Sequence, residues 1–114
     1  MLDGAITIGR GAGNRRLSDL AWAEFRQVVV GLAGSYARAI HVRNRGLGQW
    51  DDQAEENFVV IFSGMHNSHS TALRPDLGQT AHQYDQDAIA LLLGTSELIT
   101  PLRLATRNEV VYAG

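Results

Sequence analysis

The chain contains no cysteine and no lysine, and proline occurs only twice. Without cysteine it has no disulfide framework, no thiolate zinc site and no cysteine nucleophile. Without lysine it has no P-loop, which requires a Gly-Lys-Ser/Thr segment. All ten basic residues are therefore arginine, the side chain that binds carboxylates and phosphates through two parallel hydrogen bonds.

Long apolar stretches are also lacking. No run approaches the roughly 20 residues needed to span a bilayer, and Met1 to Gly4 carry no basic segment of the kind that opens a signal peptide. We therefore expect a cytoplasmic protein without membrane contact. A chain of 114 residues buries about two-thirds of its unfolded surface on folding, so we expect one domain, residues 1–114, with no metal or cofactor.

Acidic and basic residues are unevenly divided along the chain. Residues 1–50 carry seven arginines and three acidic residues, a net charge of +4, whereas residues 51–114 carry three arginines and nine acidic residues, a net charge of −6. This division predicts a positive and a negative face, and hence local anion binding or association between copies. Nucleic acid is not an expected partner, because proteins that bind it usually have a net positive charge.

The chain opens with the pattern of a strand followed by a helix. The β-branched residues of 5–8 predict a strand that ends at Gly9. Ser18 is a suitable N-cap for a helix over 18–33, in which apolar residues recur every three or four positions. Gly34 is expected to end this helix as the C′ residue.

The middle of the chain predicts two strands. Residues 36–43 alternate between two faces and predict a strand, with His41 partly buried in it, and residues 44–48 predict a turn. Residues 57–62 are apolar on both faces, as in a central strand, and we expect residues 63–70 to form a polar loop.

The last part predicts a second helix and further strands. Near-helical spacing over 75–84 predicts a helix with Pro75 in its first turn, and residues 86–93 resemble a buried strand. Residues 108–112 predict a short strand at an edge. The predicted fold is α+β: a ferredoxin-like β-α-β-β-α-β antiparallel sheet with two helices on one face and a short C-terminal extra strand.

Several short motifs resemble those of an uncharacterised family of small bacterial domains. They are a strand ending in glycine, a Trp-x-x-Phe helix, a Gly-x-Trp turn before an acidic pair, and a Gln-x-x-hydrophobic strand. In this chain they are Gly9, Trp22 with Phe25, Gly48 with Trp50, Glu55-Glu56, and Gln86 with Ile89. The chain departs from the family in lacking a proline-rich loop after the helix and in the composition of residues 65–78. Because that family has no assigned reaction, the resemblance implies the fold.

The chain is also similar in size and composition to small phage or mobile-element proteins. Some of those proteins neutralise host defence by sequestering nucleotide signals. This similarity implies a binding protein for a nucleotide-like ligand.

The segment from Gly9 to Arg16 is the main candidate for ligand binding. Glycines allow backbone N–H groups to turn toward an anion, and arginine forks bind phosphate. The segment is not a dinucleotide fingerprint, because Asn14 stands where the third glycine would be. With a ring to stack on a base, the predicted ligand-binding residues are Arg10, Gly11, Gly13, Asn14, Arg15, Arg16, Tyr36 and Trp50. The alternative is a solvated loop with no ligand.

Other arginines and acids surround this segment. Arg38, Arg43 and Arg45 flank the second predicted strand and either extend the positive surface or serve solubility. The pairs Asp51-Asp52 and Glu55-Glu56 predict a solvated acidic turn, because neighbouring residues of an extended chain point to opposite sides. Trp50 either stacks on a ligand or covers the core.

The densest group of catalytic residue types lies at 65–70. His66 and His69 are the candidates for an acid-base role in a small dimeric ferredoxin-like enzyme. As metal ligands they lack recognisable further partners, since His82 and Asp85 are the nearest. The alternative is a hydrogen-bonded polar loop.

Three functions therefore remain open. They are a non-enzymatic binder of a small anionic ligand, a histidine enzyme, and a protein inhibitor or assembly subunit. A homo-oligomer is expected in each case, because the apolar Val59, Ile61, Leu91 and Leu93 exceed what two short helices cover.

Overall fold

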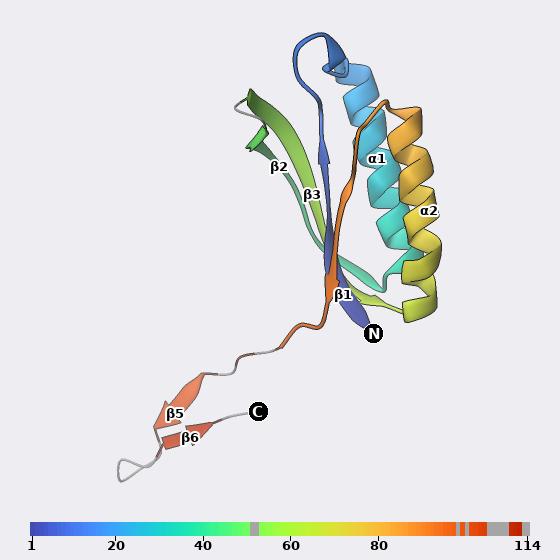
Figure 1. Cartoon of the computed structure of the whole chain (residues 1–114). Helices are drawn as coiled ribbons and strands as arrows, with labels where there is room; N and C mark the ends of the chain where they lie inside the picture. The colour runs from blue at the N-terminus through green and yellow to red at the C-terminus, as the bar shows by residue number, and fades with distance from the viewer. Residues whose placement is uncertain (51–52, 98, 100, 105–109, 113–114) are drawn as a thin grey trace.

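A computed structural model describes residues 1–50, 53–97, 99, 101–104 and 110–112. Its elements follow the order strand, helix, strand, strand, helix, strand, with a 3-10 turn after the first strand and a separate two-stranded unit at the end (Figure 1). They are β1 (Leu2–Gly9), η1 (Gly13–Arg15), α1 (Asp19–Tyr36), β2 (Ala39–Trp50), β3 (Gln53–Met65), α2 (Asn67–Gln83), β4 (Ala90–Gly94), β5 (Leu102–Leu104) and β6 (Val110–Tyr112).

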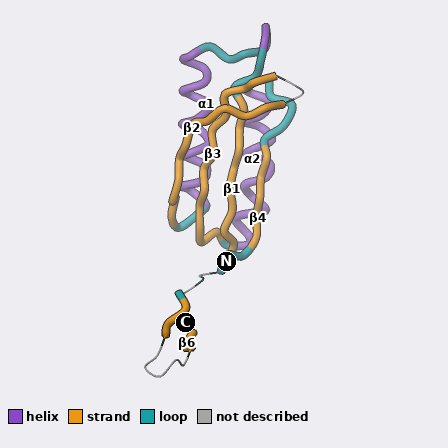
Figure 2. The backbone as a smooth tube through the Cα atoms, turned by 90° about the vertical axis from the view of Figure 1, so that its left-hand side faces the viewer, coloured by secondary structure: helices purple, strands orange, loops and turns teal. Residues whose placement is uncertain are grey.

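Four strands form one antiparallel sheet in the order β2-β3-β1-β4. In the centre, Ile6 of β1 lies opposite Val60 of β3 on one side and Leu91 of β4 on the other. Figure 2 shows β2 and β4 at the two outer edges of the sheet, with both helices behind one of its faces. The prediction of an α+β fold with an antiparallel sheet and two helices on one face is confirmed.

Helix α1 supplies the largest part of the core. The Ser18 side chain accepts a hydrogen bond from the Ala21 N–H at 3.1 Å, and so caps the helix as expected. The buried residues of α1 recur at helical spacing and face the sheet. They are Trp22, Phe25, Val29 and Ala33.

The core fills the space between the helices and one face of the sheet. Phe25 stacks on Tyr84 just beyond α2, with ring centroids 4.8 Å apart, and meets Trp22 edge-on at 6.1 Å. The sheet contributes alternate residues, as its pleat requires. These are Ile6 and Ile8 of β1, and Phe58, Val60, Phe62 and Met65 of β3.

The boundaries of the first helix and second strand differ from the prediction. Helix α1 continues through Gly34 and ends at Tyr36, with Ala37 as its C-cap. The strand predicted at 36–43 therefore begins only at Ala39, because Tyr36 is the last residue of the helix and the chain bends at residues 37 and 38. The predicted turn at 44–48 is also wrong, since β2 runs straight through it and pairs Gly46 with Asn57.

The polar segment before the second helix is helical rather than a loop. His66 caps α2, which begins at Asn67, so the loop predicted at 63–70 and the helix start at 75 are wrong. The polar sequence predicted a loop, although a helix with one buried face can be largely polar. The buried residues of α2 are Ser70, Leu73, Leu77 and Thr80. Pro75 lies inside the helix rather than in its first turn, a position that removes one N–H donor.

The last strands are shorter than expected. Strand β4 covers Ala90–Gly94 rather than 86–93, because Asp85 takes a left-handed conformation, φ 53°, and the chain turns there. Of the strand predicted at 108–112, β6 covers Val110–Tyr112 and pairs with β5, while residues 108 and 109 lie outside the described residues. The two form a sheet of their own (Figure 1).

No helix in the described part of the chain is long and apolar enough to cross a membrane.

Candidate functional site

The segment from Gly9 to Arg16 forms an ordered corner between β1 and α1. Gly11 and Gly13 take positive φ angles of 87° and 60° that glycine adopts without strain. Several backbone donors of the segment already have protein acceptors. The Gly11 N–H donates to Glu55 Oε1 at 2.7 Å, and the Arg10 N–H donates to the Glu56 carbonyl oxygen at 2.9 Å. These two N–H groups are occupied by the protein itself.

Arg10 lies at the centre of this corner, with only 7% of its side chain exposed. Its guanidinium donates to Asp19 Oδ1 at 2.6 Å, to Glu56 Oε1 at 3.1 Å and, through Nε, to the Leu17 carbonyl oxygen at 2.8 Å. The hydrogen bond to Asp19, more than the one to Glu56, raises the pKa of Arg10. Arg10 therefore joins the end of β1, the start of α1 and β3.

Arg15 and Arg16 are more exposed and also have carboxylate partners. Arg15 lies 3.3 Å from Asp87 Oδ2 and donates to the Asp85 carbonyl oxygen at 2.9 Å. Arg16 donates to Glu56 Oε1 at 2.8 Å. The two side chains thus extend in different directions from η1, and the three predicted arginines do not converge on one point.

Tyr36 is at the opposite end of the molecule from this corner. It is the last residue of α1, an 18-residue helix that spans about 27 Å. Its hydroxyl donates to Asp76 Oδ2 at 2.5 Å, and this bond, more than burial, raises the pKa of Tyr36. Tyr36 and Arg10 therefore belong to separate sites.

The backbone of Trp50 ends β2, and its side chain lies outside the described residues.

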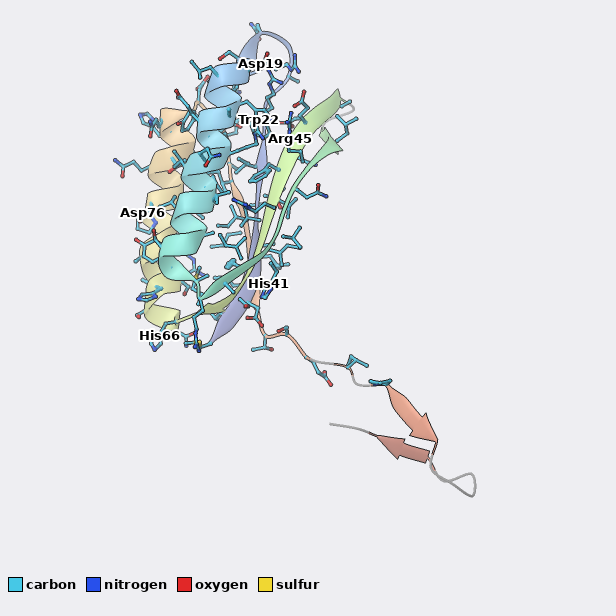
Figure 3. All side chains as sticks on the ribbon, turned by 180° about the vertical axis from the view of Figure 1, so that it is seen from behind. Asp19, Trp22, His41, Arg45, His66 and Asp76 are labelled. Carbon is cyan, nitrogen blue, oxygen red and sulfur yellow. The ribbon has the colours of Figure 1, made fainter. Side chains whose placement is uncertain are left out.

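His66 and His69 also lie at this far end, at the start of α2 (Figure 3). His66 Nδ1 accepts from the Ser68 N–H at 3.3 Å and lies 2.9 Å from Ser68 Oγ, so its ring caps the helix. His69 Nδ1 lies 3.3 Å from the Tyr36 carbonyl oxygen. The two rings, 6.0 Å apart, line a shallow depression of about 460 Å³ together with Tyr36 and Arg38.

His82 and Asp85 do not join these histidines. His82 stands 13 residues beyond His69 and in the last turn of α2, about 20 Å along the helix axis. Within the described residues no group of three or more side chains is arranged to hold a metal ion.

His41 occupies an irregular point of β2, where the pairing with β3 shifts between Ile40 and Val42. Its side chain is exposed, so the prediction of a partly buried residue is wrong. Its Nε2 lies 2.6 Å from Ser63 Oγ.

Glu55 and Glu56 are not in a solvated turn as predicted. Both lie in β3, and Glu56 lies among three guanidinium groups, with Arg16 at 2.8 Å, Arg10 at 3.1 Å and Arg45 at 3.8 Å. These partners, first of all the hydrogen bond from Arg16, lower the pKa of Glu56. Asp51 and Asp52 lie outside the described residues.

Sequence reasoning missed Arg26. It lies on α1 with its guanidinium carbon 5.5 Å from the centre of the Trp22 ring and 5.9 Å from that of Phe58. Burial, and then the nearby charge of Arg45, lowers the pKa of Arg26. Among the described residues, the two buried side-chain donors that lack a protein acceptor are Arg26 Nε and Trp22 Nε1. Both donors lie on α1, one helical turn apart.

These arginines form one surface, which we call the cationic surface: Arg16, Arg26, Arg43 and Arg45. Arg43 and Arg45 are exposed and two residues apart on β2, so they share the face of the strand that lies beside α1. Figure 3 shows Arg45 near the part of α1 that carries Trp22. The signal that would have revealed Arg26 is its position four residues after Trp22, on the edge of the apolar stripe of α1.

The cationic surface holds more positive than negative charge. Of its four guanidinium groups, those of Arg16 and Arg45 pair with Glu56, which also pairs with Arg10, while Asp19 pairs with Arg10 and is 98% exposed. Five arginines thus stand against these two carboxylates and that of Glu55, which accepts from the Gly11 N–H. Arg26 lies on α1, Arg43 and Arg45 lie on β2, and Arg16 lies just before α1. All four belong to residues 1–50, the half of the sequence with a net positive charge.

No protein-family model, curated protein or solved structure shows a significant match to this chain.

Proposed function

We propose that the protein binds a small anionic, nucleotide-like ligand without turning it over, and that the cationic surface is the binding site. The observation that supports this proposal is Arg26. Its Nε is buried without an acceptor, and its charge lies near that of Arg45. A buried donor without an acceptor destabilises a fold unless a ligand supplies the acceptor.

The chemistry of these groups suits phosphate. Guanidinium forks donate in pairs to phosphate oxygens, and a partly dry site strengthens each contact. Trp22 holds the Arg26 guanidinium by a cation–π contact, which orients the group before a ligand arrives. The Gly9 to Arg16 corner contributes Arg16 and, through Arg10, the rigid position of Glu56.

We also propose that the fold is ferredoxin-like. The order β-α-β-β-α-β, the sheet order β2-β3-β1-β4 and two helices on one face support a ferredoxin-like assignment. In a biological setting, we propose that the protein acts like small phage proteins that sequester a nucleotide signal of host defence.

Isothermal titration with pyrophosphate, mononucleotides and cyclic nucleotides tests the binding site. Arg26→Met and Arg45→Gln are each expected to weaken binding at least tenfold. Arg74→Gln, on the exposed face of α2, is the matched control and is expected to bind like the unmodified chain. Absence of binding for every anion, or equal affinity in all three variants, would contradict the proposal.

Arg26→Met also separates a ligand site from a structural arginine. Methionine keeps the apolar stem beside Trp22 and removes the guanidinium with its unpartnered Nε. We expect the variant to be as stable as the unmodified chain or more stable, and to lose binding. Such a trade of stability for function is typical of functional residues.

A second candidate function rests on the depression that His66, His69 and Tyr36 line. An acid-base enzyme there would lose turnover of any discovered substrate in the double variant His66→Ala/His69→Ala. A protein inhibitor or assembly subunit remains the third candidate, and co-purification with a host protein that survives Arg26→Met supports it.

A further inference from the structure

Strand β4 is an open edge of the sheet. It pairs with β1 on one side, and no strand in the described part of the chain pairs with its other side (Figure 2). An unpaired edge presents backbone donors and acceptors to any strand that can align with it.

This edge strand is apolar on both faces. Leu91 and Leu93 point toward the helices but stay only half-buried, and Leu92 on the opposite face is 71% exposed. Strands that are apolar on both faces normally lie inside a sheet. Beside β4, an open groove of about 850 Å³ is lined by apolar residues, among them Leu77 of α2 and these leucines, and also by Arg74, His82 and Asp87.

The other edge of the sheet is protected against pairing. Strand β2 carries the exposed charges of Arg43 and Arg45 and a register shift between Ile40 and Val42. Two copies of β2 would bring like charges together, whereas residues 88–96 around β4 contain no charged residue at all. Charge therefore allows β4, and not β2, to pair with a second copy of itself.

The geometry of Leu92 defines how two copies align. A Cβ on Gly4 would lie 2.1 Å from the Leu92 carbonyl oxygen, so that oxygen points toward β1. On its free side Leu92 is therefore at a position that makes no backbone hydrogen bond, where two opposed residues come closest. It is also the middle residue of β4.

We propose that two copies of this chain pair through β4, antiparallel, about a two-fold axis at Leu92. The two sheets then form one continuous sheet of eight strands, and Leu91 of each copy lies opposite Leu93 of the other. Such an interface is self-complementary, as two-fold symmetry requires. It is independent of the cationic surface, which lies at the other edge of the sheet.

Disulfide trapping tests this alignment directly, since the chain has no cysteine of its own. Directly opposed residues at this kind of position have Cα atoms about 4.5 Å apart, within disulfide range. The L92C chain is expected to oxidise almost completely to a covalent dimer. L47C, at an exposed leucine of the other edge strand, is the matched control and is expected to stay largely monomeric.

I61C distinguishes another arrangement, in which the open faces of two sheets stack. Ile61 is 41% exposed on that face. Faster cross-linking of I61C or L47C than of L92C would overturn the proposal.

Light scattering on the unmodified chain gives a second test. We expect twice the mass of the chain, and for Leu92→Arg a dimer Kd raised at least about 100-fold with an unchanged circular dichroism spectrum. Leu92 is too exposed for this change to prevent folding. A monomeric unmodified chain at every concentration, or a Leu92→Arg chain that dimerises as before, would refute pairing through β4.

Discussion

At the scale of single residues, Arg10 and Arg26 have opposite roles. Arg10 is buried with three protein acceptors, whereas the buried Nε of Arg26 has none. A buried cation with protein acceptors holds its neighbours in place, and a buried donor without one indicates a missing acceptor. The sequence drew attention to Arg10 through its glycine neighbours, but only contacts distant in sequence distinguish these two arginines.

Arg10→Ala is expected to destabilise the protein because acceptors in α1, in β3 and in the segment before α1 lose this donor. Urea unfolding measures the effect. Arg15→Ala is the matched control, since Arg15 is half-exposed and its ion pairs with Asp85 and Asp87 lie at the surface. The free energy of unfolding should fall several-fold more for Arg10→Ala, and equal losses in the two variants would be inconsistent with a structural role for Arg10.

At the scale of elements, the amphipathic helix and the central strand were predictable, and the polar helix was not. The buried stripe of α1 has a period that few other structures share. Helix α2 buries a serine and a threonine among its four inward residues and contains Pro75 and Gly78, so its sequence resembles a loop. Its packing against α1 and the sheet outweighs these unfavourable local preferences.

The candidate site was also only partly predictable from the sequence. The sequence placed Arg43 at the end of a predicted strand and Arg45 in the predicted turn after it, while in the sheet both stand on one face beside α1. The charge division between the chain halves was readable from sequence. The carboxylate that Arg10 shares with Arg16 and Arg45 belongs to Glu56, which lies 46 residues after Arg10 in the sequence.

Two glycines are expected to respond in opposite ways to alanine. Gly31 lies inside α1, and a Cβ there would meet nothing within 4 Å, so Gly31→Ala should stabilise the protein by about 0.5–1 kcal/mol. Gly64 has φ 73°, and its Cβ would lie 2.9 Å from Arg38 Cβ, so Gly64→Ala should destabilise it by at least about 1 kcal/mol. Thermal unfolding of both variants checks the signs, and a stabilised Gly64→Ala chain would contradict the backbone geometry.

At the scale of the whole molecule, carboxylates at both ends of the sheet tie segments together. Asp3 accepts from Ser96 and from the Gly64 N–H, Asp19 accepts from Arg10, and Glu56 accepts from Arg16 and Arg10. Each of these hydrogen bonds lowers the pKa of its carboxyl group in the folded state. Folding is therefore linked to the ionisation of groups far apart in the chain.

Stability is expected to depend on pH in the acid range. A lowered pKa in the folded state means that these groups stabilise the fold fully above their unfolded values, 3.8 for the aspartates and 4.5 for Glu56. The stabilisation is lost as pH falls through the lower folded values. Urea midpoints measured between pH 2 and 6 should drop below about pH 4.5, and Glu56→Gln should flatten the upper part of that drop. A profile that Glu56→Gln leaves unaltered would argue against the network around Glu56.

The arginine Nε–Hε resonances of the folded protein test most directly whether the cationic surface binds an anion. In a titration of ¹⁵N-labelled protein with pyrophosphate and then a mononucleotide, the signals of Arg26 and Arg45 should shift and saturate together, while that of Arg74 stays in place. The largest change is expected at Arg26, whose buried Nε gains an acceptor. Shifts confined to other arginines, or a uniform response that never saturates, would contradict it.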